Sequence, residues 1–275
     1  MPILTNEIFL SIIHGLTEFL PVSNSAHLIL LERVFEFKMN PDVEWAANWA
    51  ALSVILIYFR RDLAAMIRQT FIFMGKYPAS ENRAELADEY PHALLTGFIL
   101  LATISTAALG FIFKDFFKTG FNSLSVISIA WMVMGLVLIF SKKLAGHPRP
   151  LDLMSHRDAF IIGVAQGISF IPGLSRPGAT LFAGQACEIE IKDAARFSFL
   201  IAIPVILWKM FILKDDIDFS QLDLISFAAA FSAAFIAGYL ALTILMFTIQ
   251  NKKFHWFGYY SLAMGTILLG YSLLS

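Results

Sequence analysis

The chain has 275 residues, of which 58% are hydrophobic and 15% are charged, and its formal net charge is -1. Soluble domains contain about 45–50% apolar and about 25% charged residues, so this composition excludes a soluble globular protein. The balanced charge offers no basic field for nucleic acid, and no glycine-rich loop follows a strand pattern, which excludes nucleic-acid binding and a Rossmann-type fold. We therefore expect an all-α integral membrane protein.

The first apolar region is broken at Pro21 into segments 6–20 and 22–37. Each segment is shorter than the roughly 20 residues that a helix needs to cross a hydrocarbon core of about 30 Å. Ser23 and Asn24 follow the break, and polar groups persist at membrane depth only where protein or water satisfies them. The pattern favours a re-entrant helical hairpin over a single span kinked at proline.

Three full membrane spans are predicted next, at 44–60, 92–114 and 121–141. The segment 61–91 carries charges of both signs, so we expect a solvated cytoplasmic loop with an amphipathic start. A second cytoplasmic loop is expected at 142–156.

A second interrupted region follows, in which Pro172-Gly173 separates 157–171 from 175–188. Ser175 and Arg176 come directly after this break, so a second re-entrant hairpin is expected. The remaining apolar stretches are long enough for three more spans. They are 193–213, 222–250 and 254–274, which gives about six full spans in all.

The two breaks resemble each other, because the residues from His14 to Ser23 can be laid against those from Gln166 to Ser175 with single-residue gaps. The sequence therefore predicts two repeats, about 1–141 and about 157–275, within one membrane domain, 1–275. A hairpin plus three spans makes an odd number of crossings, so the second repeat enters from the opposite side. Inverted-topology repeats are common in transporters, which raises a transport hypothesis.

The positions of Lys and Arg predict the orientation. One face carries Arg60, Arg61, Arg68, Lys76, Arg83, Lys142, Lys143, Arg149, Arg157, Lys192, Lys252 and Lys253, and the positive-inside rule makes this face cytoplasmic. The other face carries Lys38, Lys114, Lys118 and Lys214. Both termini are then expected outside, with the tips of the two hairpins close together.

Glu18 and Arg176 lie near the middle of the two hairpins, where a charge costs about 2.5–3.5 kcal/mol unless it is paired or hydrated. They are expected to face one polar cavity, and an ion pair that merely joins the hairpins is the alternative. Arginine matches phosphate with two parallel hydrogen bonds, and the helices after both breaks direct free N–H groups and a positive dipole end at the cavity. These features predict a phosphate site. Pro177 and Gly178 suit the first turn of such a helix.

Candidate catalytic groups accompany this site. His27 lies one helical turn after Ser23, so its imidazole could accept the hydroxyl proton or attack phosphorus. His14 lies one turn before Glu18 and is an accessory candidate. Two ligands without a third make a weak zinc site, and a hard cation that bridges phosphate and Glu18 is the better metal hypothesis.

At these residues the sequence resembles a known family. The stretch from Gly15 to Ser23 with His27, and the stretch from Pro172 to Thr180, are similar to the two signature motifs of the bacterial undecaprenyl-diphosphate phosphatase family, also called the bacitracin-resistance family. The resemblance covers most of the chain. It implies a multi-pass enzyme of the bacterial inner membrane that removes one phosphate from undecaprenyl diphosphate on the external side. It also implies dependence on a divalent cation, Mg²⁺ or Ca²⁺, and regeneration of the carrier lipid for cell-wall polymers.

The resemblance assigns roles to individual residues. Its catalytic set is Glu18, Ser23, His27 and Arg176. Its phosphate-binding set is Asn24, Ser25, Ser175, Arg176, Gly178 and Thr180. Glu18 is also the expected metal ligand, the partners are a polyprenyl lipid phosphate and the bilayer, and no oligomeric state is implied.

The chain departs from the family pattern at several positions. His14 stands where the family has Glu or Gln, Asn24 where it usually has a second serine, and Pro177 where it usually has serine. Because an amide cannot replace a nucleophilic hydroxyl, either Ser23, Ser25 or His27 attacks, or the protein does not hydrolyse. The alternatives to a polyprenyl-diphosphate phosphatase are thus a non-hydrolytic polyprenyl-phosphate transporter and a phosphatase for another lipid phosphate.

Overall fold

The computed structural model describes residues 2–79, 85, 88–113, 123–144, 148–218, 220 and 222–274. The long elements in these ranges are all helices, and the one pairing of extended backbone there is an isolated bridge between Arg149 and Ile189. In chain order the helices are α1 (Pro2–Phe19), α2 (Asn24–Phe35), α3 (Pro41–Tyr58), α4 (Arg60–Lys76), α6 (Pro91–Ile112), α8 (Leu124–Phe140), α9 (His156–Ile168), α10 (Arg176–Ala186), α11 (Ile191–Leu213), α12 (Leu224–Gln250) and α13 (Trp256–Leu274). Short 3-10 turns cover Tyr77–Ala79, Ser141–Lys143, Leu151–Leu153 and Lys214–Asp216.

Five helical segments in the described ranges are long and apolar enough to cross a membrane. They are Pro91–Ile112, Leu124–Lys143, Ile191–Leu213, Leu224–Gln250 and Trp256–Leu274. The sixth predicted span, 44–60, corresponds to α3, which is helical but is not among the five. Asp42, Glu44 and Asn48 lower the hydropathy of its first half. The protein is a multi-pass membrane protein.

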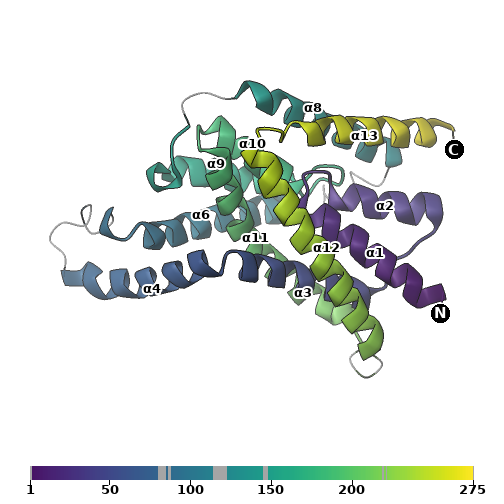
Figure 1. Ribbon diagram of the computed structural model, residues 1–275, viewed down its shortest axis with the longest axis horizontal. Helices are drawn as coiled ribbons and strands as arrows, with labels where there is room; N and C mark the ends of the chain where they lie inside the picture. The colour runs from purple at the N-terminus through teal and green to yellow at the C-terminus, as the bar shows by residue number, and fades with distance from the viewer. Residues whose placement is uncertain are drawn as a thin grey trace.

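The chain breaks at both predicted positions. The helix is interrupted between α1 and α2 and again between α9 and α10, and the two helices of each pair contact each other (Figure 1). Proline lacks a backbone N–H and disfavours helical backbone at the residue before it, which favours both interruptions, although the helix α11 continues through Pro204. Both breaks lie in the interior of the molecule, where their polar groups can meet.

Long helix pairs hold these breaks in place. α1 packs along α12, α9 packs along α6, and α8 packs along α13 (Figure 1). A Cβ atom at Gly15 of α1 would overlap the carbonyl oxygen of Ala234, and one at Gly163 of α9 would overlap the carbonyl oxygen of Ala102. Small residues allow such close approach of helices in a membrane. Glycine thus allows α1 and α9 to lie close against α12 and α6.

The apolar core extends over most of the helices, and one part of it packs against the end of α1. Phe19 is fully buried, and its ring lies 5.8 Å from that of Phe199, which in turn lies 6.0 Å from that of Phe59. Because Phe19 directly follows Glu18, this packing fixes the end of α1 and the direction of the carboxylate beside it.

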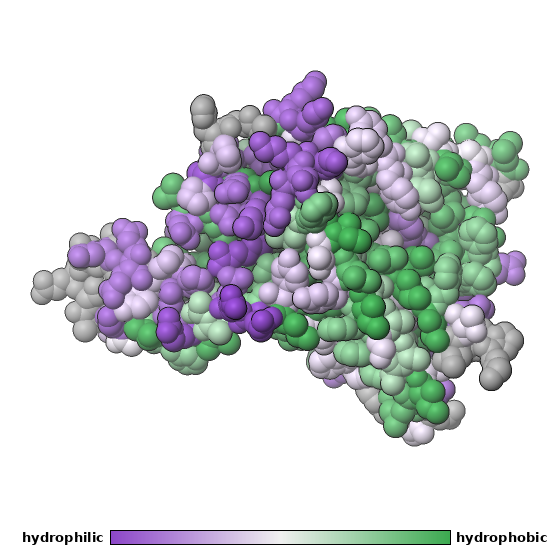
Figure 2. Space-filling view, in the orientation of Figure 1, coloured by the Kyte–Doolittle hydropathy of each residue, from purple (hydrophilic) through white to green (hydrophobic). Residues whose placement is uncertain are grey.

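The predicted loop at 61–91 begins as α4, a helix of 17 residues that projects from one end of the molecule, while α1 begins and α13 ends on the opposite side (Figure 1). Hydrophilic surface gathers toward the α4 end, and apolar surface covers α12 and its neighbours (Figure 2). Several parts of the loop predictions lie outside the described residues. They are 80–84, 86–87, 145–147, Lys114 and Lys118.

Candidate active site

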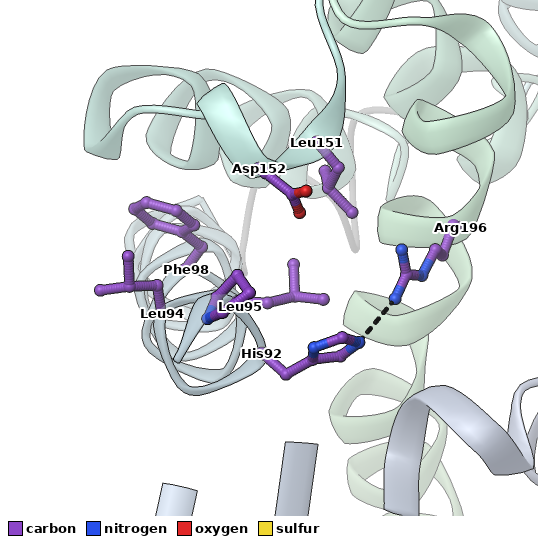
Figure 3. A pocket seen from close by; sticks show the side chains of 8 residues that line it. His92, Leu94, Leu95, Phe98, Leu151, Asp152 and Arg196 are labelled. Carbon is purple, nitrogen blue, oxygen red and sulfur yellow. Dashed lines mark hydrogen bonds between the residues drawn. The ribbon is translucent and has the colours of Figure 1, made fainter. Parts of the chain in front are cut away.

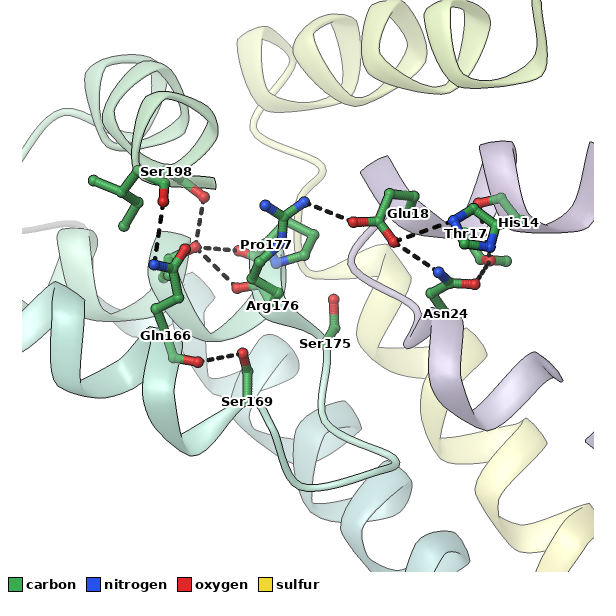
Figure 4. A network of polar contacts seen from close by, with 12 residues as sticks. His14, Thr17, Glu18, Asn24, Gln166, Ser169, Ser175, Arg176, Pro177 and Ser198 are labelled. Atoms are coloured by element: carbon green, nitrogen blue, oxygen red, sulfur yellow. Dashed lines mark hydrogen bonds and ion pairs between the residues drawn. The ribbon is translucent and has the colours of Figure 1, made fainter. Parts of the chain in front are cut away.

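The two breaks meet at an ion pair between the last turn of α1 and the first turn of α10. Arg176 Nη2 donates to Glu18 Oε1 at 3.0 Å, and the two side chains are only 14% and 15% exposed (Figure 4). The backbone N–H of Gly173 also donates to Ser25 Oγ at 3.4 Å, which joins one break to the start of α2. The predicted proximity of the tips, and of Glu18 to Arg176, is confirmed.

The second oxygen of Glu18 is held by Asn24. Asn24 Nδ2 donates to Glu18 Oε2 at 2.7 Å, and Thr17 Oγ1 lies 3.0 Å from Asn24 Oδ1, within donating distance (Figure 4). His14 Nε2 is 3.9 Å from Glu18 Oε2, and this fully buried ring has no hydrogen-bond partner among the described residues. The Asn24 amide therefore orients the Glu18 carboxylate.

Helix α10 begins at a serine cap. Ser175 Oγ accepts from the backbone N–H of Gly178 at 3.2 Å, and Pro177 occupies the first turn, where its missing N–H costs nothing. Thr180, one turn on, donates to the carbonyl of Arg176 at 2.9 Å and shares a hydrogen bond with Ser198. Gly178 and Thr180 thus stabilise the turn that carries Arg176.

Helix α2 begins at a strained residue. Ser23 has φ 68°, a left-handed value that costs a non-glycine residue about 1 kcal/mol or more. Its carbonyl accepts from His27 Nδ1 at 2.8 Å. A carbonyl cannot donate, so Nδ1 carries the proton and Nε2 accepts from the Tyr260 hydroxyl at 2.7 Å. Trp131 meets the His27 ring edge-on at 4.8 Å. Both nitrogens of His27 are therefore engaged in holding the break.

A cavity of about 200 Å³ opens beside the ion pair. Five of the predicted site residues line it, namely Glu18, Asn24, Ser25, Ser175 and Arg176. Five others do not, namely His14, Ser23, His27, Gly178 and Thr180. Of the three candidate nucleophiles Ser23, Ser25 and His27, Ser25 alone lines this cavity.

Four further polar residues, which the sequence did not mark as part of the site, lie at the cavity. Thr17, Asn48, Ser169 and Lys209 also line the cavity. Lys209 Nζ lies 2.9 Å from Glu44 Oε1, and Asn48 Nδ2 donates to the carbonyl of Glu44 at 2.7 Å. A lysine within the apolar stretch 193–213 was the signal that could have revealed the first of these contacts.

The side chains around Glu18 determine how the site could hold the expected divalent cation. Within the described ranges no three His, Cys, Asp or Glu side chains cluster as metal ligands. Glu18 offers one carboxylate, already engaged by Arg176 and Asn24. Mg²⁺ is commonly held by one or two carboxylates together with substrate phosphates. Glu18 suits such a site, in which protein and substrate both supply ligands, and does not suit a site formed by protein ligands alone.

A second hollow lies between α6, α11 and the turn Leu151–Leu153. It is lined by His92, Leu151, Asp152 and Arg196 among others, and its volume of about 20 Å³ suits a single water molecule (Figure 3). Arg196 Nη2 lies 3.2 Å from His92 Nε2 and also pairs with Asp62. These contacts connect α4, α6 and α11, and we assign them a structural role.

A neighbouring buried pair has the same structural character. Arg149 Nη2 donates to Asp158 Oδ2 at 2.6 Å. Burial raises the pKa of the Asp158 carboxyl, but hydrogen bonds from Ser155 and Arg149 outweigh burial and leave that pKa below its ordinary value. The carboxylate therefore stays ionised and caps α9 through Ser155.

Comparison with known proteins connects this geometry to a family. The family model of the bacitracin resistance protein BacA matches residues 7–267. The chain is 31% identical over 269 residues to the undecaprenyl-diphosphatase of Carboxydothermus hydrogenoformans and 33% identical over 266 residues to that of Halothermothrix orenii, with 95% of both chains covered in each case. It is 32% identical over 263 residues to undecaprenyl-diphosphatase 1 of Shouchella clausii, covering 94% of this chain and 92% of that one. The chain therefore belongs to the bacitracin resistance protein BacA family.

Proposed function

We propose that this protein is an undecaprenyl-diphosphate phosphatase, which hydrolyses the lipid diphosphate to the monophosphate and inorganic phosphate. The observation that carries this proposal is the cavity in which Arg176 and Glu18 meet at the start of α10. An arginine and a helix N-terminus bind phosphate, and a carboxylate can move a proton. The relatives named undecaprenyl-diphosphatase match the chain over almost its whole length, which supports the same substrate here.

The reaction can be assigned to residues that line the cavity. Arg176 and the N–H groups at the starts of α2 and α10 bind the diphosphate. The oxygen of Ser25 forms a bond to the terminal phosphorus as the anhydride P–O bond breaks, and its proton passes to Glu18 directly or through water. Water then hydrolyses the phosphoserine, which releases phosphate and restores the hydroxyl. His27 and Ser23 hold the break in the position that exposes Ser25.

A divalent cation, Mg²⁺ or Ca²⁺, is proposed to arrive with the substrate. Glu18 and the phosphate oxygens would hold it together, and it would neutralise part of the charge on the leaving phosphate.

The fold is proposed to be an inverted-topology repeat, with α1–α2 and α9–α10 as re-entrant hairpins and α3 as the sixth span. The helix pairs support this reading. If α1 corresponds to α9 and α6 to α12, the packing of α1 on α12 is matched by that of α9 on α6. The glycine contacts repeat as well, since Gly15 and Gly163 both press on an alanine carbonyl of the partner helix.

We infer that the protein lies in the bacterial inner membrane with both termini outside. Under this orientation Glu44 in the first turn of α3 and Lys209 near the end of α11 lie toward the external face. The cavity that Lys209 lines then opens toward that face, which supports removal of phosphate on the external side.

The test is phosphate release by the purified protein from undecaprenyl diphosphate, with Mg²⁺, with Ca²⁺ and with chelator, and with Glu18→Gln as the blank. We expect release that requires the cation and is lost in the blank. Release that is unchanged in Glu18→Gln would contradict the assigned site. No release from protein that still binds the lipid would overturn hydrolysis and leave transport of the lipid phosphate as the function.

A further inference from the structure

Lys209 places a second cation at the cavity that holds Glu18 and Arg176. It lies in α11, one of the five segments long and apolar enough to cross a membrane, between Trp208 and Met210. A lysine in a membrane helix is costly unless it is paired or reaches water, so its presence in this span needs a reason.

Extension of the side chain to the membrane interface would be the simplest reason, because lysines near helix ends commonly do this. The contacts point elsewhere. Lys209 Nζ lies 2.9 Å from Glu44 Oε1 of α3, and the residue lines the cavity together with Arg176. The Lys209 side chain is 43% exposed and that of Glu44 is 28% exposed, so the ammonium is both tethered and open to a ligand.

Glu44 is itself fixed in position. It lies in the first turn of α3, and Asn48 Nδ2 donates to its carbonyl at 2.7 Å while also lining the cavity. The helices α3 and α11 pack against each other, which keeps the two charged groups together. Lys209 therefore belongs to the wall of the cavity, and Glu44, which does not line it, holds the lysine from α3.

Arg176 and Lys209 have more hydrogen-bond donors than Glu18 and Glu44 occupy. Arg176 Nη1 is buried and has no hydrogen-bond partner in the part of the chain that the structure describes. An ammonium has three donors, and one of those of Lys209 is directed at Glu44. One arginine suits one phosphate group, whereas a diphosphate presents two groups of oxygens and more negative charge.

We propose that Lys209, held by Glu44, binds one of the two phosphate groups of a lipid diphosphate while Arg176 binds the other, so that the site selects the diphosphate over the monophosphate. This proposal rests on the proposed function, because it assigns the second phosphate of that substrate to a residue.

The test compares the affinities of two lipids. Binding of undecaprenyl diphosphate and of undecaprenyl phosphate to the full chain is measured in detergent with chelator present, so that no cation replaces the lysine. Lys209→Met should weaken diphosphate binding roughly tenfold or more, as expected for loss of one hydrogen-bonded charge, and monophosphate binding less than about threefold. Lys209→Arg should retain most of the selectivity.

Lys214→Met is the matched control. Lys214 directly follows the last residue of α11, its ammonium lies 4.1 Å from the centroid of the Phe211 ring, and it does not line the cavity, so its loss should leave both affinities within about twofold. Because Lys209→Met leaves Glu44 without its partner, the double variant Lys209→Met/Glu44→Gln is measured as well, and it should show the same loss of selectivity.

Equal weakening for both lipids, or no weakening, would overturn the role of Lys209. The comparison does not depend on turnover. If the wild-type protein prefers the diphosphate but releases no phosphate, hydrolysis fails while the assignment of Lys209 is still decided. If the wild-type protein binds both lipids equally, the assignment fails whatever the turnover.

Discussion

Arg176 Nη2 lies 3.0 Å from Glu18 Oε1, although the two residues are 158 positions apart in the chain. If this pair acts on the substrate, Glu18→Gln should lower kcat by about 100-fold or more, the usual effect of losing a proton-transfer group. Arg176→Gln should instead raise KM, because the phosphate loses its bidentate partner. Steady-state phosphate release measures both effects.

The double variant Glu18→Gln/Arg176→Gln tells a catalytic pair from a purely structural one. Removing one partner of a buried pair leaves an unpaired charge and destabilises the fold, whereas removing both does not. The double variant should therefore regain the Tm of the wild-type protein and remain inactive. Recovery of activity along with Tm would mean that the pair only joins the two breaks.

Ser25 and Ser23 have hydroxyl oxygens 3.3 Å apart, yet Ser25 lines the cavity and Ser23 does not. We expect Ser25→Ala to lower kcat about 100-fold or more. Ser23→Ala should remove the cap that accepts from the Ala26 N–H and cost about 1 kcal/mol of stability, with kcat reduced far less. Phosphate release and thermal unfolding of both variants check this, and the reverse order of the two kcat values would move the nucleophile to Ser23.

His27 and Tyr260 share a hydrogen bond of 2.7 Å, which occupies the imidazole nitrogen that would otherwise be free for catalysis. If His27 only positions the break, Tyr260→Phe should also reduce kcat, though less than His27→Gln, because the histidine variant loses the hydrogen bond to the Ser23 carbonyl as well as the one to Tyr260. A nucleophilic or basic His27 would instead make His27→Gln inactive and leave Tyr260→Phe nearly normal. The pH profile of Tyr260→Phe adds a second readout, because a positioning residue leaves its shape unchanged.

Much of the fold can be predicted from the sequence because it depends on local physics. Pro21 and Pro172 interrupt the helix because a proline ring removes a backbone hydrogen bond, and apolar runs of about 20 residues form spans for lack of water to satisfy their backbones. Proline alone does not end a helix, since Pro204 lies inside α11, and the polar residues beside the two breaks complete the signal. The helix α3 was harder to classify. Its polar first half reflects contacts with other helices, since Glu44 pairs with Lys209 from α11, and hydropathy along a single stretch does not contain that information.

The site could be predicted only in part, because contacts between distant parts of the chain are not visible in a single stretch of sequence. Glu18 and Arg176 are conspicuous because they are charged residues within apolar, proline-broken stretches, and they do meet. The direction of His27 could not be derived from its spacing to Ser23, because helical spacing places two side chains on one face without saying which nearby group takes the hydrogen bond. That partner, Tyr260, lies 233 positions away.

Gly15 and Gly163 are expected to be essential for packing. Alanine at either position would drive a methyl group into the backbone of a neighbouring helix, and such overpacking typically costs about 1–3 kcal/mol. Gly97→Ala is the matched control, because nothing lies within 4 Å of a Cβ atom there. Thermal unfolding in detergent should show a lower Tm for the first two variants and an unchanged or higher Tm for the control. An equal Tm in all three would contradict the close approach of α1 to α12 and of α9 to α6.

The orientation of the chain can be tested with added cysteines, because the native one is unreactive. Burial raises the pKa of the Cys187 thiol to about 11, so it stays protonated at neutral pH and reacts slowly with maleimides. Lys38→Cys and Ala64→Cys both place a thiol at an exposed position, the first between α2 and α3 and the second on α4. With both termini outside, a membrane-impermeant maleimide added to intact spheroplasts should label Lys38→Cys and spare Ala64→Cys until the membrane is opened. The wild-type protein, which should remain unlabelled, is the blank. The reverse pattern would turn the cavity of Glu18 and Arg176 toward the cytoplasm, and phosphate would then be released on that side.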